Sequence, residues 1–269
     1  MSEATARLRR GQTADRVIPV LIAVLALCAW EAIVRWRGVP AYILPAPSLI
    51  ARTLVTDWGT LWPAWLITLK VTALALLASV VGGVGLAFLF TLSRWIERSL
   101  FPFAIILQVT PIIAIAPLIL IYAPDTLSAL LLCAWIVAFF PVLSNTVTGL
   151  RSADRNLQDL FTLYGATRWQ RLRLLLAPSA LPYFLAGLRV AGGLSLIGAV
   201  IAEFTAGTAG QESGLAWRIL EASFRLNVAR MFAALALISV TGIAIFVALN
   251  FLTRKLLGHW HESQLPEHG

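Results

Sequence analysis

The residues that could carry chemistry in this chain are single polar or charged groups set inside long apolar runs. They are Lys70, Asn145, Arg189 and Glu203. A charge inside hydrocarbon is costly unless it is paired or hydrated, so such residues usually face the interior of a helix bundle or a water-filled path. We therefore expect these four side chains to be candidates for a path along which a polar solute crosses a membrane.

Each of these positions also has a purely structural interpretation. Lys70 could extend its side chain to the outer membrane surface. Arg189 could pair with Glu203 or donate to free backbone carbonyls. Asn145 is a small polar group that could bridge two helices. The sequence leaves these alternatives open.

Metal-dependent or nucleophilic catalysis has little support in the sequence. All three histidines lie in the C-terminal tail, at His259, His261 and His268, and Cys28 and Cys133 lie in separate apolar runs. The apolar runs contain no His, Cys or Asp cluster that could hold a metal or form a nucleophile–base pair. A phosphate-binding G-x-x-x-x-G-K-S/T motif is also absent from the sequence. We expect a protein that is not an enzyme and holds no cofactor of its own.

The composition places the protein in a membrane. Of its 269 residues, 59% are hydrophobic and only 13% are charged, and the mean hydropathy is +0.83. A soluble domain is about half apolar and a quarter charged. The net charge of +8 could indicate nucleic acid, but membrane proteins collect lysine and arginine at their cytoplasmic ends. We therefore expect membrane lipid, and no nucleic acid, as a partner.

Six apolar segments are long enough to cross a bilayer, because about 20 helical residues span its ~30 Å hydrocarbon layer. They cover residues 17–36, 61–92, 100–122, 127–150, 181–204 and 228–257. The protein is therefore expected to be all-α and polytopic, with about six transmembrane helices. Pro102, Pro111 and Pro117 predict a bent helix in the third segment. Short helices are expected at 48–57 and 214–223, and a short charged turn at 93–99.

The distribution of basic residues predicts the orientation. If the N-terminus is cytoplasmic, 13 of the 21 lysine and arginine residues lie in cytoplasmic segments, six in external segments and two within spans. This bias favours cytoplasmic termini at both ends. The predicted organisation has cytoplasmic tails at 1–16 and 258–269, a first transmembrane helix with an external interfacial segment at 17–60, and a main transmembrane domain at 61–257. Residues 151–180 form a cytoplasmic loop within that domain.

The charged interval around that loop contains an amphipathic pattern. Leu157, Leu160, Phe161 and Tyr164 recur at three- and four-residue spacing, which predicts a short amphipathic helix. Gly165 then ends it, as a helix C-terminal glycine does. A second short helix is expected over 167–177, closed by Pro178. On spacing alone, the interval is either a docking element or an ordinary solvated loop.

The same interval resembles the signature loop of permease subunits of bacterial ATP-binding-cassette (ABC) importers. That loop reads Glu-Ala-Ala, three residues, Gly, nine residues and Ile-x-Leu-Pro. Here Asp159-Leu160-Phe161 stands for the triplet, followed by Gly165, Leu175 and Ala177-Pro178. The Gly–Pro spacing matches, while the triplet and the residue before Pro178 depart from the motif.

Further stretches resemble the sulfonate, taurine, nitrate and pyrimidine-precursor permeases of that group. They occur in order along most of the chain: LPAPS (44–48), LSRWIER (92–98), TPIIAIAPL (110–118), FPVLSNTVTGLRSADRNL (140–157), LPYFLAGLRVAGG (181–193) and IAEF (201–204). The resemblance implies a type I ABC importer permease fold in a bacterial inner membrane. It does not identify the solute, which could be a sulfonate, nitrate, a pyrimidine or a vitamin precursor.

The resemblance also implies partners and site residues. Such importers pair two permease chains, often two copies of one, with two cytoplasmic ATPase subunits that bind ATP and Mg²⁺, and with an external solute-binding protein. The residues that would couple this chain to the ATPase are Arg155, Asp159, Leu160, Phe161, Tyr164, Gly165 and Pro178. Leu160, Phe161 and Tyr164 would fill an apolar groove, and Asp159, with Arg151 and Arg155 nearby, would orient the contact through charges at its rim. A self-sufficient secondary transporter or channel is the main alternative.

Overall fold

The computed structural model describes residues 2–207 and 213–258, and all regular structure in these residues is helical. The helices are α1 (Ser2–Trp36), α2 (Pro47–Thr56), α3 (Trp58–Leu92), α4 (Arg94–Val109), α5 (Ile112–Tyr122), α6 (Thr126–Arg151), α7 (Arg155–Leu163), α8 (Arg168–Arg171), α9 (Ala177–Ala206), α10 (Leu215–Phe224) and α11 (Val228–Leu257), with a π-helical segment, η1 (Leu172–Leu176), before α9. The all-α prediction is confirmed. The three tail histidines lie outside the described residues.

Five helices in the described residues are long and apolar enough to cross a membrane. They are α1, α3, α6, the stretch from α8 through α9, and α11, while α4 and α5 form a pair bent by 105°. An ion pair between Arg151 and Glu97 joins the end of α6 to the start of α4. The α4–α5 pair therefore leads away from this end and α6 returns to it. The pair thus counts as one broken span, which gives six candidate crossings in the described residues.

The region before α6 differs from the expectation in two ways. Residues 93–99 are not a turn, because Ser93 accepts a hydrogen bond from the Ile96 N–H and caps α4, so the charged residues form its first turns. The third apolar segment is not one bent helix but two helices separated at Thr110 and Pro111. Proline has no N–H and disfavours helical geometry in the residue before it, and Thr110 is accordingly extended.

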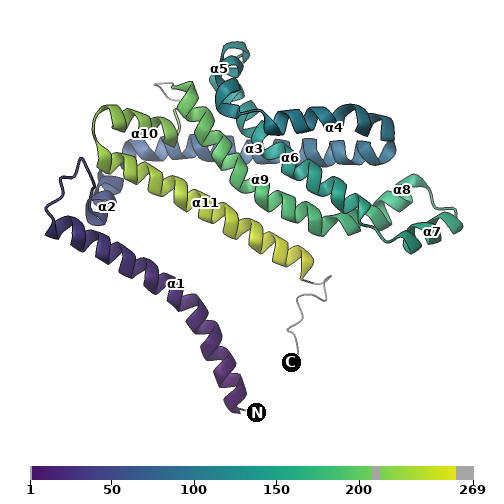
Figure 1. Ribbon diagram of the computed structural model, residues 1–269, viewed down its shortest axis with the longest axis horizontal. Helices are drawn as coiled ribbons and strands as arrows, with labels where there is room; N and C mark the ends of the chain where they lie inside the picture. Colours follow the sequence, from purple (N-terminus) through teal and green to yellow (C-terminus); the bar gives the residue numbers. More distant parts are fainter. Residues whose placement is uncertain (1, 208–212, 259–269) are drawn as a thin grey trace. The chain divides into compact units, whose positions relative to one another are not determined.

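The chain divides into two compact units, of which the larger contains residues 62–217 and 236–269. Its centre is the antiparallel pair α6 and α9, which lie side by side (Figure 1). Gly187 makes the close crossing possible, since a Cβ there would lie 2.7 Å from the Asn145 Cβ and from the Pro141 oxygen. Small residues allow this approach in membrane helices. Helix α3 packs on the same pair, with Val71 and Ala75 in a buried cluster with α6 and α9.

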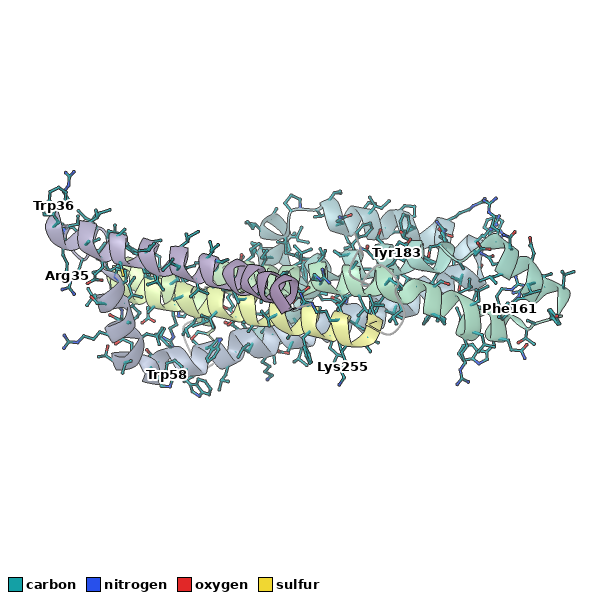
Figure 2. All side chains as sticks on the ribbon, turned by 90° about the horizontal axis from the view of Figure 1, so that it is seen from below. Arg35, Trp36, Trp58, Phe161, Tyr183 and Lys255 are labelled. Atoms are coloured by element: carbon teal, nitrogen blue, oxygen red, sulfur yellow. The ribbon has the colours of Figure 1, made fainter. Side chains whose placement is uncertain are left out.

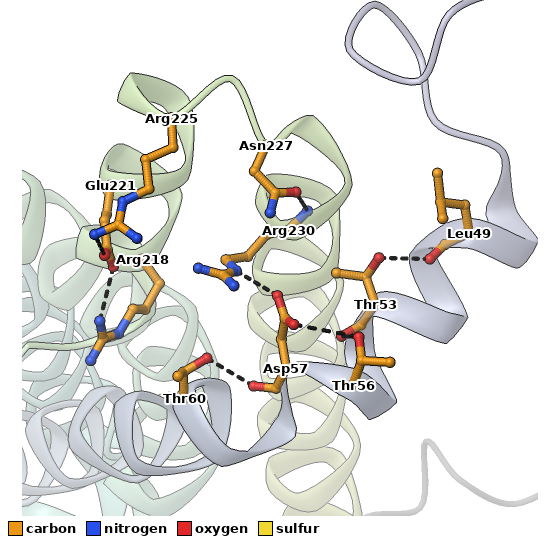
Figure 3. Close-up of polar contacts among 10 residues, drawn as sticks. All are labelled: Leu49, Thr53, Thr56, Asp57, Thr60, Arg218, Glu221, Arg225, Asn227 and Arg230. Carbon is orange, nitrogen blue, oxygen red and sulfur yellow. Dashed lines mark hydrogen bonds and ion pairs between the residues drawn. The ribbon is translucent and has the colours of Figure 1, made fainter.

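The smaller unit contains residues 1–61 and 218–235. The Glu31 carboxyl accepts hydrogen bonds from Arg35 Nε (2.5 Å) and from the Ser48 hydroxyl (2.7 Å) and N–H (3.0 Å). Glu31 and Arg35 thus form an ion pair within α1, and the same carboxyl also caps the first turn of α2. At the other end of α2, Asp57 pairs with Arg230 of α11 (Figure 3).

A group of charges on α10 completes the smaller unit. Glu221 bonds to Arg218 and to Arg225, each at 2.9 Å (Figure 3). The hydrogen bond and charge of Arg218, with the charges of Arg225 and Arg230, hold the pKa of Glu221 below its usual value. The short helix predicted at 214–223 is present as α10.

Candidate functional site

The predicted amphipathic helix is present as α7, a nine-residue helix with defined ends. The Asp154 side chain begins it by accepting hydrogen bonds from the N–H groups of Asn156 (2.7 Å) and Leu157 (3.2 Å). An acidic N-cap satisfies N–H groups that have no partner within the helix. The sequence therefore specifies both the position and the start of this helix.

Gly165 ends α7 as the pattern predicted. Its φ of +66° is in the left-handed region that glycine adopts without steric cost. The N–H of Ala166 donates to the Phe161 carbonyl (2.9 Å) and that of Gly165 to the Thr162 carbonyl (3.0 Å). These two bonds are the Schellman pattern of a helix C-terminus. The chain consequently turns sharply from α7 into α8.

The apolar side chains of α7 are largely open to solvent in the single chain. The exposed fractions are 46% for Leu157, 44% for Leu160, 85% for Leu163 and 82% for Tyr164. Phe161 is half-buried and is seen on α7 at one end of the side-chain view (Figure 2). An exposed apolar face rimmed by charges is typical of a surface that binds another protein.

The charged residues predicted beside this face are also exposed. Arg155 and Asp159 both lie on the surface of α7. Arg151, which the pattern placed near them, pairs instead with Glu97 at the start of α4. The α7 surface thus combines apolar side chains with one basic and one acidic group.

Helix α8 follows α7 and is tied to it. The Thr167 hydroxyl accepts from the Gln170 N–H (3.2 Å) and the Gln170 side chain accepts from the Thr167 N–H (2.8 Å), which is a capping box. Arg171 Nη2 donates to Thr162 Oγ1 on α7 at 2.9 Å. Helices α7 and α8 lie beyond the ends of α6 and α9 (Figure 1).

The expectation that Pro178 closes the second short helix is wrong. The backbone continues helically from Arg168 to Ala206. A proline removes an N–H and crowds the carbonyl four residues earlier. Immediately before Pro178, the helix widens to π geometry, with the Ala177 N–H donating to the Leu172 carbonyl. This wider turn accommodates the proline without ending the helix.

The four candidate path residues are not brought together in the single chain. Lys70 on α3 and Arg189 on α9 are exposed. The Asn145 amide is part-buried and donates to the Pro141 carbonyl (2.8 Å) within α6. Arg189 and Glu203 lie on the same helix, about 21 Å apart along its axis at 1.5 Å per residue. The two therefore do not form the pair that was one structural alternative for Arg189.

Glu203 is buried, with 2% of its surface exposed. Its carboxyl oxygens accept hydrogen bonds from Thr68 Oγ1 (2.8 Å) and from the Ala216 N–H (2.9 Å). Thr68 Oγ1 in turn accepts from the Leu215 N–H (2.9 Å). Because Leu215 and Ala216 begin α10, Glu203 and Thr68 together cap its first turn. This arrangement positions the start of α10 against α3 and α9.

Two residues of this network were not singled out from the sequence. Thr68 lies in an apolar run with no local signal, since its partners are far away in the chain. Gly214 has a clearer local signal in the sequence, because it directly precedes the short amphipathic helix. A Cβ at Gly214 would overlap the Glu203 carboxyl group. Glycine at this position therefore allows the carboxyl to reach the helix N–H groups.

Comparison with known proteins agrees with this architecture. Residues 79–258 match the family described as "Binding-protein-dependent transport system inner membrane component". The chain therefore belongs to this family of ABC transport permeases.

Named relatives match over nearly the full chain. The riboflavin transport system permease protein RibX of Chloroflexus aurantiacus is 36% identical, with 91% of this chain and 90% of RibX covered. The formylaminopyrimidine transport permease protein ThiX of Halalkalibacterium halodurans is 31% identical, with 91% and 96% covered. Both relatives are named as transport permeases.

A solved structure supports the fold independently. The crystal structure of an amino acid ABC transporter with histidines matches with a TM-score of 0.64 at 18% identity, covering 76% of this chain and 97% of that one. The predicted permease fold is confirmed, and the apolar helices agree with a multi-pass inner-membrane protein.

Proposed function

We propose that this chain forms the membrane path of an ATP-driven importer for a small polar or anionic solute, delivered by an external binding protein. Within the range expected from the sequence, a nitrogen heterocycle of the vitamin or vitamin-precursor kind has the best support. The support is that RibX and ThiX, at 36% and 31% identity, are named for riboflavin and a formylaminopyrimidine.

The observation that carries the proposal is the exposed apolar face of α7. Leu160 and Tyr164 are 44% and 82% exposed on an ordered helix at a charged end of the membrane helices. We propose that this face docks in a groove of a cytoplasmic ATPase subunit, with Arg155 and Asp159 at its rim. The amphipathic helix-in-groove mode uses such anchors, and Gly165 sets the exit angle of the chain.

The proposed ATPase partner supplies the hydrolysis. The sequence of this chain has no G-x-x-x-x-G-K-S/T loop for nucleotide phosphates, so ATP and Mg²⁺ would be bound by that partner alone. The proposed orientation has both termini in the cytoplasm, as six crossings require them to share one side and the arginine distribution favours that side.

Two copies of the permease are proposed to enclose the path. Lys70 and Arg189 are exposed in the single chain and lie well within α3 and α9. Charges at such depth rarely face lipid and usually line a cavity or the interior of a bundle. A second permease chain would cover them, and Asn145 would lie near the inner mouth of the path. Glu203 is assigned mainly to positioning α10.

Co-purification with the proposed ATPase subunit tests the docking. The variant Leu160→Glu places a charge in the proposed contact, and Phe224→Glu is a matched control because Phe224 is 77% exposed on α10. Burial of a leucine is worth about 1.5–3 kcal/mol, so Leu160→Glu should weaken ATPase retention by at least about tenfold. Equal retention by both variants would refute the docking.

Transport in proteoliposomes tests the energy source. Uptake of riboflavin or a formylaminopyrimidine should require ATP, the ATPase and the binding protein together. Uptake by the permease alone, driven by an ion gradient, would support the secondary-transporter alternative instead.

A further inference from the structure

A basic cavity lies where α3 turns into α4 and where α6 leads into α7. It has a volume of about 590 Å³ and is lined by Arg94, Arg98 and Arg151, with Gln158 of α7. A second cavity of about 560 Å³ shares Arg94 and Gln158 with it and adds two arginines of α8, Arg168 and Arg171. The two cavities therefore have part of their wall in common, and we call them together the arginine cavity.

The charge of the arginine cavity is not balanced by the chain itself. Glu97 is the one acidic residue that lines it, against five arginines. That carboxyl is already paired with Arg151. Five guanidinium groups around one neutralised carboxylate repel one another, and an anion between them would relieve the repulsion.

Arg171 is an incompletely hydrogen-bonded arginine beside the arginine cavity. Its Nη2 donates to Thr162, but its Nε is buried and has no hydrogen-bond partner. A buried donor without an acceptor is destabilising, and such groups are rare in folded proteins. Because Nε has almost no accessible surface, a ligand in the arginine cavity would reach Arg171 through its terminal guanidinium nitrogens.

An apolar cavity of about 500 Å³ adjoins the arginine cavity along the membrane helices. Three elements contribute consecutive residues to the two cavities: Ala87 and Phe88 on α3, Val147 and Thr146 on α6, and Leu176 and Ala177 at the start of α9. Consecutive helical residues point about 100° apart, so the two cavities lie on neighbouring faces of these elements. A ligand that fits both spaces has a compact anionic head and an apolar chain.

We propose that this composite site binds an anionic phospholipid, with its phosphate in the arginine cavity and one acyl chain in the apolar cavity. Basic pockets between membrane helices at the membrane surface bind such headgroups. The apolar cavity favours a lipid over a free phosphate, which would use only the basic part. A lipid bound here would contact Arg94 on α4, Gln158 on α7 and Arg171 on α8. It would thus hold the α7–α8 segment against the ends of α3 and α4.

Native mass spectrometry of the purified full chain tests the proposal. The chain is titrated with phosphatidylglycerol, phosphatidylcholine and soluble glycerol phosphate. Phosphatidylglycerol should bind at least about tenfold more tightly than phosphatidylcholine. Both lipids offer a phosphate for charge-assisted hydrogen bonds, but only the phosphatidylglycerol headgroup has a net negative charge. Glycerol phosphate should not displace it. Equal binding of the two lipids would overturn the proposal.

Variants separate the two parts of the site. Arg94→Gln with Arg171→Gln should weaken phosphatidylglycerol binding by about tenfold or more. Gly85→Phe should do the same, because Gly85 lines the apolar cavity and a Cβ there meets no atom within 4 Å. The matched control is Arg37→Gln with Arg225→Gln, two exposed arginines of the other unit.

Three further outcomes are decisive. If Arg171→Gln impairs folding, a second double variant replaces it: Arg98→Gln with Arg168→Gln, at two exposed arginines. This variant must show the same loss of phosphatidylglycerol binding for the proposal to stand. If Gly85→Phe binds lipid as wild type does and glycerol phosphate competes with the lipid, the site takes small anions only. That outcome would refute the phospholipid proposal. Loss of a permease dimer in Gly85→Phe, with lipid binding intact, would mean that a second copy covers the apolar cavity and would refute it as well.

Discussion

Replacement of Glu203 tests whether this buried carboxyl positions α10 or lines the solute path. Glu203→Ala removes the acceptor of the Ala216 N–H (2.9 Å) and that of Thr68 Oγ1 (2.8 Å). The buried N–H left without a partner costs about 1–3 kcal/mol, and the lost threonine bond about 1 kcal/mol. Thr68 retains a weaker acceptor, the Ala64 carbonyl at 3.3 Å. The variant should therefore lose about 2–4 kcal/mol of stability.

Glu203→Gln is the matched comparison. The amide oxygen can accept from the Ala216 N–H while the amide nitrogen donates to Thr68 Oγ1, whose own hydrogen can turn to the Ala64 carbonyl. This variant should lose about 1 kcal/mol or less, because the network keeps its connections. The order of stability is thus wild type, Gln, then Ala.

Thermal unfolding in detergent, followed by tryptophan fluorescence, measures these differences. The Ala variant should unfold on the order of 10 °C lower than wild type. A double-mutant cycle with Thr68→Val should give a coupling energy of about 1–3 kcal/mol between the two side chains. If both Glu203 variants unfold like wild type yet transport is lost, Glu203 acts in the path, and the positioning role is wrong.

Four other predictions concern stability and the proposed docking helix. Gly165→Ala forces a residue with a Cβ into a φ of +66°, so it should cost about 1–2 kcal/mol and increase hydrogen exchange in α7. Asp154→Ala removes the N-cap of α7, costs about 1 kcal/mol and should reduce ATPase retention in the co-purification assay. Gly187→Leu brings side-chain atoms against Asn145, and the overpacking should lower the unfolding temperature by an amount equivalent to about 1–3 kcal/mol or more. Arg218 holds the pKa of Glu221 below its usual value, so their pairing stabilises the fold above the ordinary glutamate pKa and is lost as pH falls through the lowered value. Glu221→Gln should therefore unfold at a lower temperature than wild type at neutral pH, and the difference should disappear as pH falls below the lowered pKa of Glu221. A constant difference across pH would contradict this.

Local patterns in the sequence predicted most of the helices. The last apolar segment, 228–257, coincides with α11, and α6 differs from its prediction by one residue at each end. A membrane-spanning segment can be recognised from its composition alone, because each of its residues must suit hydrocarbon or the helix interior. Helix α7 was equally clear, since its apolar spacing and terminal Gly165 are both local signals.

The effects of the prolines on helix geometry were predicted less well, because they depend on the packing around each helix. Pro111 separates two helices at 105°, whereas Pro178 is accommodated by a π-helical turn in a continuous helix. Both residues carry the same local restriction. Packing of Leu172 and Ala180 in the buried cluster with α3, α4 and α6 stabilises the continuous path at Pro178.

The sequence by itself determined the membrane class, the family resemblance, the apolar spans and the amphipathic α7, since each is encoded by residues close together in the chain. Only the tertiary structure showed that Glu31 caps α2 and that Glu203 with Thr68 caps α10. It alone gathered arginines from α4, α6 and α8 around one cavity. Hydrogen bonds and charges act over a few ångströms in space. Thr68 and Glu203 are 135 positions apart in the sequence, so no local pattern exists from which their contact can be predicted.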